Sequence, residues 1–432
     1  WQNSVMVQHY RFGAALESVG FGPWFDKVSL SGLRIDMPRL TPSSKGEAMI
    51  RYCVRCVMPE TKPDIFFDDD GVCSACVHFE SRAEVDWQER SDELDRVLES
   101  YRDRSGQNYD CIIPVSGGKD STYQVIRMLE LDMTPLCVTA TTDELSEVGR
   151  RNIENLQLLG VDHVAVTTNP RVRRRINRLA LTQVGDISWP EHVAIFTVPV
   201  RLAVQLHIPL IVWGENPQNE YGGPAAAADE RVLTRRWLEE FGGMLGLRVS
   251  DLLGQEDISQ RDLIQYTYLD DAALARVGVT GLFLGYFTPW DGWGNALISQ
   301  AHGFETVPRT VEGSLVNYEN LDNVQTGIHD YFKFLKYGFG RATDLACMQI
   351  RRGRLSRQDA VHLVGLLDGK FPWTYLDYPI EETLSRIGMS ISEFQEVCDR
   401  FTNKKVFMLD GRGNLARDAV GNLIKINDDN ES

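Results

Sequence analysis

The pattern of apolar and polar positions is regular in the middle of the chain. Between residues 110 and 225, short apolar and β-rich runs alternate with segments whose apolar residues recur at helical spacing. The runs predict strands at 111–115, 136–140, 163–168 and 209–213. Strands that alternate with helices indicate βαβ units, so we expect an α/β fold with a doubly wound parallel sheet. Ligands of such sheets bind beyond the carboxyl ends of the strands.

Helical spacing dominates after this region, and residues 226–404 are predicted to be a mainly helical region that contacts substrate or partner. Ser356 and Ser390 each precede an acidic residue three positions on, which is the spacing of a capping box and predicts two helix starts. Fewer strands are therefore expected here than in 110–225.

The remaining segments have weaker patterns. Residues 83–109 are charged with sparse apolar positions, as in an exposed linker helix. The Asp410-Gly411 pair between short apolar runs predicts a hairpin within 405–432, followed by an acidic tail. Residues 1–48 lack clear periodicity, and we treat them as an extension of uncertain status.

Composition narrows the class of protein. The chain has 432 residues, 43% hydrophobic and 25% charged, which is typical of a soluble globular enzyme with two or three domains. Acidic residues outnumber basic ones by 61 to 45, so a net charge of −16 makes nucleic acid an unexpected partner. No apolar run approaches the roughly 18 to 20 residues of a membrane span, and we see no secretory signal. We therefore expect a cytoplasmic protein without a membrane partner.

Four cysteines form two C-x-x-C pairs within 49–82. The pairs are "CVRC" and "CSAC", separated by sixteen residues, and supply Cys53, Cys56, Cys73 and Cys76. Two such turns can close a tetrahedral Zn²⁺ site without an open position. Free redox dithiols are the alternative, but the strand-to-helix context of a thioredoxin-like motif is absent. We expect a zinc module that contributes to stability or docking.

The stretch "SGGKDS", 116–121, follows a predicted strand and opens a predicted helix. It is too short for the wrap of a Walker A loop, and it is not a G-x-G-x-x-G loop. Glycines allow close backbone approach, amide groups point at the ligand, and the helix start adds positive potential, so the loop predicts an anion site. Asp120 would repel phosphate unless Mg²⁺ lies between them. The alternative is an ordinary strand-to-helix turn.

The same stretch resembles the pyrophosphate-binding loop of the PP-loop ATP pyrophosphatases, the superfamily of asparagine synthetase, GMP synthetase, NAD synthetase and tRNA-thiolating enzymes. These enzymes split ATP between the α and β phosphates. The resemblance implies that the loop binds the departing pyrophosphate and that residues after the second strand lie near adenosine. The nucleotide-binding residues it implies are Ser116, Gly117, Gly118, Lys119, Asp120, Ser121, Thr139, Ala140 and Thr141.

Longer stretches across 49–408 resemble one branch, the N-acetyl sugar amidotransferases of surface-polysaccharide and nonulosonic-acid biosynthesis. They include "WGENPQNEYGG", "GLFLGYFTPWDGWGNA", "TVEGSLVNYENLDN" and "TGIHDYFKFLKYGFGRATD". The resemblance implies an AMP-forming ligase of lipopolysaccharide or O-antigen synthesis. It would adenylate the acetamido oxygen of a nucleotide sugar or nonulosonic acid, and ammonia would then displace AMP to leave an acetamidino group.

This chemistry assigns roles to further residues. Glu215, Asn216 and Glu220 offer carboxylate and amide groups to Mg²⁺, sugar or ammonia, with a polar surface turn as the alternative. Trp290, Asp291 and Asn295 suit a sugar, although tryptophans also pack in cores. The basic stretch 333–357 predicts an anion anchor, with a solvated face as the alternative. From it we select Lys336 and Arg341 for ATP and Arg351 and Arg352 for substrate. The predicted catalytic residues are Lys119, Asp120, Ser121, Glu215, Lys336 and Arg341.

Ammonia needs a source. A class II glutaminase requires an N-terminal cysteine, and a class I glutaminase requires a glycine-flanked cysteine elbow with a histidine; the sequence has neither. We therefore expect a separate glutaminase, and the resemblance implies one similar to the paired synthase and glutaminase subunits of histidine biosynthesis.

Two other functions fit parts of the sequence. A PP-loop tRNA-thiolating enzyme is the main alternative, but no cysteine pair follows the loop and the net charge opposes an acidic polymer. A non-catalytic zinc-binding adaptor is the other, and the intact loop argues against it. The sequence does not identify the sugar.

Overall fold

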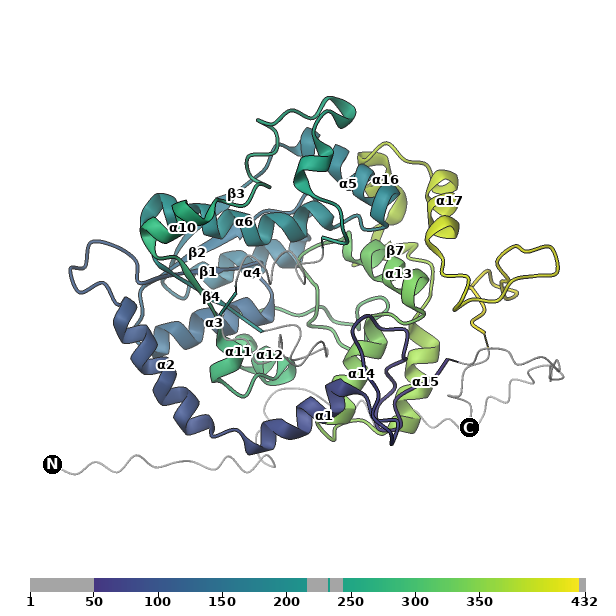
Figure 1. Cartoon of the computed structure of the whole chain (residues 1–432), viewed down its shortest axis with the longest axis horizontal. Helices are drawn as coiled ribbons and strands as arrows, with labels where there is room; N and C mark the ends of the chain where they lie inside the picture. The colour runs from purple at the N-terminus through teal and green to yellow at the C-terminus, as the bar shows by residue number, and fades with distance from the viewer. Residues whose placement is uncertain (1–49, 216–231, 234–243, 427–432) are drawn as a thin grey trace. The chain divides into compact units, whose positions relative to one another are not determined.

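A six-stranded sheet forms the centre of the molecule (Figure 1). The structure is a computed structural model that describes residues 50–215, 232–233 and 244–426. The strand order is β3-β2-β1-β4-β6-β5. The first five strands in this order pair in parallel, and the last, β5, pairs antiparallel with β6. The strands are β1 Cys111–Pro114, β2 Pro135–Ala140, β3 Asp162–Val166, β4 Leu210–Trp213, β5 Val232–Leu233 and β6 Thr280–Phe283. The predicted parallel sheet is confirmed.

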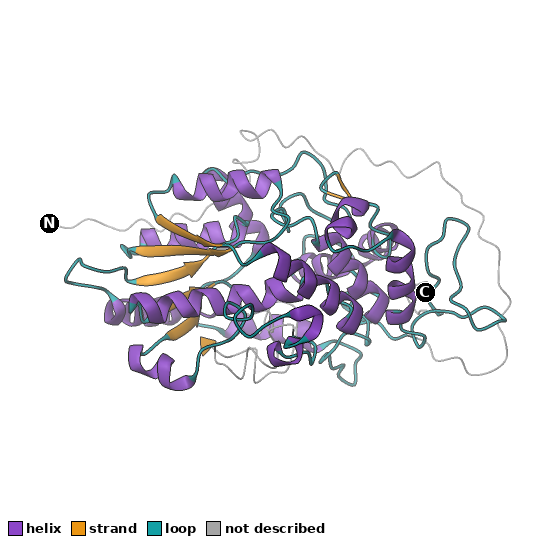
Figure 2. Cartoon of the chain, turned by 90° about the horizontal axis from the view of Figure 1, so that it is seen from above, coloured by secondary structure: helices purple, strands orange, loops and turns teal. Residues whose placement is uncertain are grey.

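Helices cover both faces of this sheet, and Figure 2 shows the strands between two helical layers. The connecting helices are α3 Lys119–Glu130, α4 Glu147–Gln157, α5 Pro170–Val184 and α6 Trp189–Leu206. Because side chains alternate along a strand, Ile112 and Val138 pack in the same apolar cluster as residues of α5 and α6. Their neighbours Ile113 and Cys137 pack with residues of α3 on the other face. The sheet is therefore doubly wound, as predicted.

The sheet also draws on the region predicted to be mainly helical. Strand β6, Thr280–Phe283, pairs with β4 along all four of its residues. Its apolar run continues directly into the short helix α11, Leu284–Phe287. Periodicity cannot assign a short apolar run of this kind to a strand or a helix, which explains why the sequence missed it.

Other elements agree with the sequence in type and place. Ser356 caps α15 and Ser390 closes a full capping box on α17, as their spacing predicts. The linker contains one helix, α2. The elements outside the sheet connections include α1 Ser74–Ser81, α2 Trp87–Tyr101, α10 Asp271–Val277, α12 Gly292–Ala301, α13 Thr326–Tyr337, α14 Arg341–Arg351, α15 Arg357–Leu367, α16 Ile380–Arg386 and α17 Ile391–Phe401, with the two-stranded sheet of β7 Thr374–Tyr375 and β8 Tyr378–Pro379.

The end of the described chain forms turns rather than one hairpin. Isolated antiparallel bridges join Leu409 to Leu415 and Arg417 to Leu423, and an outer bridge joins Phe407 to Lys425. The first turn encloses Asp410-Gly411, where the sequence places it. Extended runs between the turns are too short to form strands.

The cysteine-rich segment packs against the C-terminal helices. Cys53, Cys56, Cys73 and Cys76 share one apolar cluster with Phe339 and with residues of α14 and α15. Figure 1 shows α1 beside these two helices. Among the described residues, none of the helices combines the length and the hydropathy that crossing a bilayer requires.

Candidate functional site

The glycine loop lies where the sequence places it, between β1 and the start of α3. Gly117 has a φ of +81°, and a Cβ there would lie 2.8 Å from the carbonyl oxygen of Gly149. A side chain is therefore excluded by both backbone conformation and space. The loop is closed by its own hydroxyls, since Ser121 Oγ donates to the Gly118 carbonyl and Ser116 Oγ accepts from the Gly118 amide. Ser116 remains exposed beside the start of α3.

Lys119 is buried next to this loop, with a side chain only 5% exposed. Its Nζ lies 2.6 Å from Asp120 Oδ2 and 2.7 Å from Glu319 Oε1. Burial alone would lower the pKa of Lys119, but the two carboxylates outweigh it and raise that pKa above its usual value. Lys119 is therefore a fixed positive charge rather than a mobile one.

Glu319 belongs to a segment that the sequence did not assign to the site. Leu321 and Asp322 lie against the start of α4, where Ser146 Oγ donates to the Leu321 carbonyl and the Ser146 amide to the Asp322 carbonyl. Asp322 also interacts with Ser116 of the glycine loop. Burial raises the pKa of Asp322 to about 6, against the opposing effects of its own amide, Lys119 and Ser116. A distant part of the chain thus adds two carboxyl groups to the loop.

Helix α12 supports the loop from another side. Asn295 donates from Nδ2 to Asp120 Oδ1 at 2.8 Å, and Ser299 Oγ donates to the Lys119 carbonyl at 2.7 Å. Asp291 caps this helix by accepting from the Gly294 amide. Asn295, predicted from the sequence to contact sugar, is therefore brought to Asp120 of the loop.

The donor set fits ATP with Mg²⁺. Asp120, Glu319 and Asp322 place three carboxyl groups around one lysine, which would repel a pyrophosphate without a further cation. Mg²⁺ is commonly held by one or two carboxylates together with substrate phosphates. Asp120 and Glu319 are the residues that would hold it.

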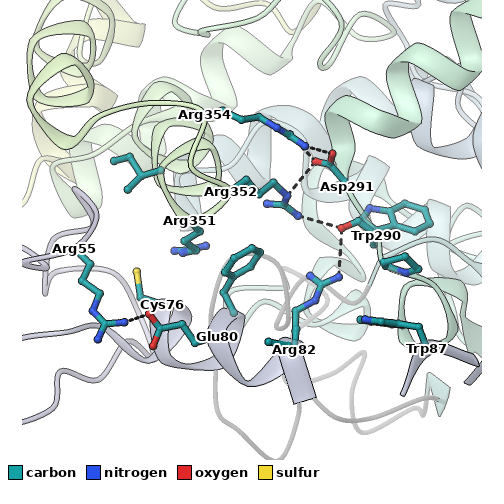
Figure 3. Close-up of a pocket in the computed structure, with 14 residues that line it drawn as sticks. Arg55, Cys76, Glu80, Arg82, Trp87, Trp290, Asp291, Arg351, Arg352 and Arg354 are labelled. Carbon is teal, nitrogen blue, oxygen red and sulfur yellow. Dashed lines mark hydrogen bonds and ion pairs between the residues drawn. The ribbon is translucent and has the colours of Figure 1, made fainter. Parts of the chain in front are cut away.

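A cavity of about 880 Å³ has Asp291 in its lining (Figure 3). Five arginines line it together with two acidic residues, Glu80 and Asp291. Phe79 and Trp87 add aromatic surface. The arginines are Arg55, Arg82, Arg351, Arg352 and Arg354. The charged lining has an excess of three positive charges, five minus two, which favours an anionic ligand.

Ion pairs and a hydrogen bond tie the arginines of this pocket to the residues just before α12. Arg352 and Arg354 lie 3.0 Å and 2.5 Å from the carboxylate of Asp291, and Arg82 donates to the carbonyl of Trp290. Burial opposes ionisation of Asp291, but the neighbouring arginines lower its pKa overall. Trp290 itself is core material, because it is 2% exposed and its ring packs edge-on against Tyr123 at 5.4 Å.

The four cysteines form a closed cluster with the geometry of a metal site. All four are buried, with Sγ–Sγ distances of 3.9 Å for Cys53–Cys76 and 3.7 Å for Cys56–Cys73. A tetrahedron with Zn–S bonds of about 2.3 Å has edges of about 3.8 Å, so Zn²⁺ fits. The cluster could therefore bind a metal ion as the spacing predicts.

The remaining predicted residues fall into three groups: some lie at the edge of the sheet near the glycine loop, some have partners elsewhere, and some lie outside the described residues. Thr139 and Ala140 end β2 at the ligand edge of the sheet, with Thr141 next to them, and Glu215 follows β4 at the same edge. Lys336 and Arg341, predicted for the ATP side, already have partners outside the loop: the Val184 carbonyl and Asp330. Asn216 and Glu220 lie outside the described residues.

Known proteins resemble parts of this chain. Residues 312–417 match the family described as LPS biosynthesis protein WbpG-like, C-terminal domain. No curated protein matches the chain.

Two solved structures resemble about half of the chain. NMN synthetase from Francisella tularensis matches with 13% identity and a TM-score of 0.25 over 52% of this chain and 99% of that one. The NH3-dependent NAD synthetase from Campylobacter jejuni, in complex with the nitrate ion, matches with 12% identity and a TM-score of 0.26 over 53% and 100%. At these values neither likeness carries an argument about this chain.

Proposed function

We propose that the protein is an ATP-dependent amidotransferase that acts on an N-acetylated sugar and takes its ammonia from a separate glutaminase. The acetamido oxygen attacks the α-phosphate of ATP, which forms an O-adenylyl imidate and releases pyrophosphate. Ammonia then displaces AMP, which leaves with the former acetamido oxygen, and the sugar keeps an acetamidino group. The match of 312–417 to a domain of LPS biosynthesis proteins supports a sugar as the substrate.

One observation carries the proposal: the carboxylates of Asp120 and Glu319 fix the buried Lys119 at the glycine loop. A fixed positive charge beside a loop of backbone amides stabilises charge on a leaving pyrophosphate. Mg²⁺ on these carboxylates would neutralise the remaining phosphate charge. Lys119 therefore holds the leaving group, and Asn295 fixes the orientation of the Asp120 carboxylate.

The arginine-lined pocket supports a substrate that carries its own negative charge. The pocket and the loop share the Asp291–Gly292 corner, since a Cβ on Gly292 would lie 3.2 Å from Lys119 Cε. The phosphates of a nucleotide sugar or the carboxylate of a nonulosonic acid would bind the arginines, and the aromatic rings would contact a base or sugar ring. We assign Arg352 and Asp291 to the positioning of this group.

Zinc completes the proposal as a structural ion. We assign it to the four cysteines, because a closed site of four thiolates leaves no coordination position for chemistry. Its role is to hold the segment that carries Arg55 against α14 and α15.

Product analysis tests the proposed function. Purified protein is incubated with ATP, Mg²⁺, ammonium and a panel of N-acetylated nucleotide sugars and nonulosonic acids. We expect AMP and pyrophosphate to appear only when sugar and ammonium are both present, together with a sugar in which NH has replaced oxygen. Release of ADP and phosphate would contradict the proposal, and release that depends on tRNA would favour thiolation instead.

A further inference from the structure

Asp186, His192 and His329 form a cluster that the proposed function does not use. Nδ1 of His329 lies 2.8 Å from Asp186 Oδ1, and Nδ1 of His192 lies 3.3 Å from Asp186 Oδ2. The two imidazole rings meet nearly at right angles, with centroids 5.0 Å apart. One potential ligand atom from each residue falls within 4.8 Å of the others. Three segments of the chain thus converge on a single point.

The backbone around Asp186 fixes its carboxylate. Gly185 ends α5 in the left-handed conformation, and Asp186 Oδ1 accepts from the Ser188 amide two residues on, just before α6 begins. Asp186 is 2% exposed. Oδ1 therefore contacts the Ser188 amide and His329, while Oδ2 faces His192.

His192 has a buried nitrogen that the described residues leave without a hydrogen bond. Its Nδ1 is shielded from solvent, and the 3.3 Å approach to Asp186 Oδ2 does not meet the geometry of a hydrogen bond. The Asp186 carboxylate lies at ion-pair distance from this nitrogen, and a buried polar atom without a well-formed hydrogen bond is a place where an ion or water can bind. The lone pair of an imidazole nitrogen beside a carboxylate oxygen is the donor set of a metal ion.

The spacing agrees with a first-row divalent ion. Bonds of about 2.0–2.1 Å from nitrogen and oxygen to tetrahedral Zn²⁺ separate the ligand atoms by about 3.3 Å. The His192–Asp186 distance has this value, and the shorter His329–Asp186 distance is that of a shared proton, which a metal ion would replace. Three protein ligands leave the fourth position of a tetrahedral ion to another ligand. The two histidine side chains beside it are 30% and 28% exposed.

We propose that Asp186, His192 and His329 bind a divalent transition-metal ion, with Zn²⁺ as the preferred occupant, and leave one coordination position for an oxygen or nitrogen ligand. The site is of the three-ligand type with an open position, in contrast to the closed cluster of four cysteines.

The cluster lies at the ligand edge of the sheet. His192 and Phe196 are one turn apart on the same side of α6. The ring of Phe196 packs 5.2 Å from that of Trp213, the last residue of β4. An ion bound there would face the side of the sheet on which Glu215 and the glycine loop lie, and its open position could take a group of the substrate.

One neighbouring charge moderates the expected affinity. Lys336 acts electrostatically on Asp186, and its Nζ donates to the Val184 carbonyl at 2.7 Å. We therefore expect the ion at the histidines to exchange with a chelator before the ion at the four cysteines does.

Metal counting on the full chain tests the proposal, without ATP or sugar, so its outcome is independent of the proposed function. The protein is stripped and titrated with Co²⁺, and bound metal is measured by mass spectrometry with absorption in parallel. We expect two equivalents: one that produces thiolate-to-cobalt charge transfer, and one that adds only weak ligand-field bands. His192→Ala and His329→Ala should each bind one equivalent with the thiolate band intact.

Two controls make the result decisive. His302→Ala, which changes an exposed histidine at the end of α12, should retain both equivalents, and Cys76→Ser should lose the thiolate band. Saturation of the wild type at one equivalent would overturn the proposal, as would two equivalents in His192→Ala. If a histidine variant loses the thiolate band through misfolding, the wild-type titration alone decides between one and two equivalents.

Discussion

Lys119 illustrates how single residues set the chemistry of the site. The side chain is buried between the carboxylates of Asp120 and Glu319, which are 199 positions apart in the sequence. Because the opposite charges hold its ammonium group in place, the proposed release of pyrophosphate would need little reorganisation of Lys119 as negative charge develops. Replacing it removes the charge and leaves Asp120 and Glu319 facing each other without compensation.

We therefore expect Lys119→Ala to lower the rate of pyrophosphate release by about 100-fold or more. Burst measurements of radiolabelled pyrophosphate check this, with Lys370→Ala as a control that removes an exposed lysine away from the loop. Metal bound at the four cysteines should be unchanged, which separates loss of chemistry from loss of folding. A rate within about threefold of the wild type would mean that Lys119 does not contact the leaving group.

Asp322 makes stability depend on pH. Its folded pKa is raised from 3.8 to about 6, so its contribution favours folding below about pH 4 and is lost as the pH rises through 6. Asp322→Asn keeps the shape without the charge. As the pH rises from 4 to 8, the wild type should lose stability that the variant keeps. The difference in unfolding free energy between variant and wild type should therefore shift by about 1–2 kcal/mol in favour of the variant, allowing for partial solvent screening. Urea unfolding of both proteins at pH 4 and at pH 8 measures this shift. A difference between variant and wild type that is the same at both pH values would count against a buried, protonated Asp322.

At the scale of elements, the sequence predicts those with strong local patterns. Strands β1 to β4 and the caps at Ser356 and Ser390 follow from runs and spacings within a few residues. Strand β6 was missed because its four residues, TGLF, run directly into α11 and carry no period of their own. Arg173 shows the same limit: the basic run at 171–178 gives no local sign that this arginine is buried and paired with Asp143.

The site was only partly predictable for a related reason. Glycines, lysine and serines of the loop are adjacent in sequence, so their joint chemistry is visible there. Glu319 and Asp322 act through partners in the distant glycine loop, and Asp186 lies 143 residues from His329. An isolated acidic residue in a polar loop gives no sign of such a neighbour. The packing of 319–323 against the start of α4 reveals Glu319 and Asp322, and the contact with His329 reveals Asp186.

The cysteine-rich segment packs against α14, and both elements contribute arginines to the pocket described above. This arrangement leads to a prediction about Arg55. Arg55 lines that pocket, whereas Arg51 belongs to the same segment, pairs with Glu60, and is absent from the lining. We expect Arg55→Ala to raise KM for the sugar by about three- to tenfold with kcat unchanged, since one partly exposed charge is worth about 1 kcal/mol. Steady-state kinetics at low ionic strength check this.

Arg51→Ala is the matched control and should leave KM unaltered. Equal effects of the two substitutions would show that the general charge of the segment, rather than the pocket, attracts the substrate.

At the scale of the whole molecule, three separate parts of the chain meet at one place. The sheet supplies the glycine loop, the C-terminal region supplies Glu319 and Arg352, and the cysteine-rich segment supplies Arg55. The part that matches an LPS biosynthesis domain, 312–417, therefore contributes Glu319 directly to the glycine loop. This arrangement couples the proposed sugar pocket to the proposed ATP site through Asp291 and α12.

The central claim is that the acetamido oxygen attacks the α-phosphate. The most direct test uses an accepted N-acetyl sugar labelled with heavy oxygen in the acetyl carbonyl, together with ATP, Mg²⁺ and ammonium, and measures AMP by mass spectrometry. We predict that AMP carries one heavy oxygen for every acetamidino group formed. Unlabelled AMP, or label found in phosphate or retained in the sugar product, would contradict the account.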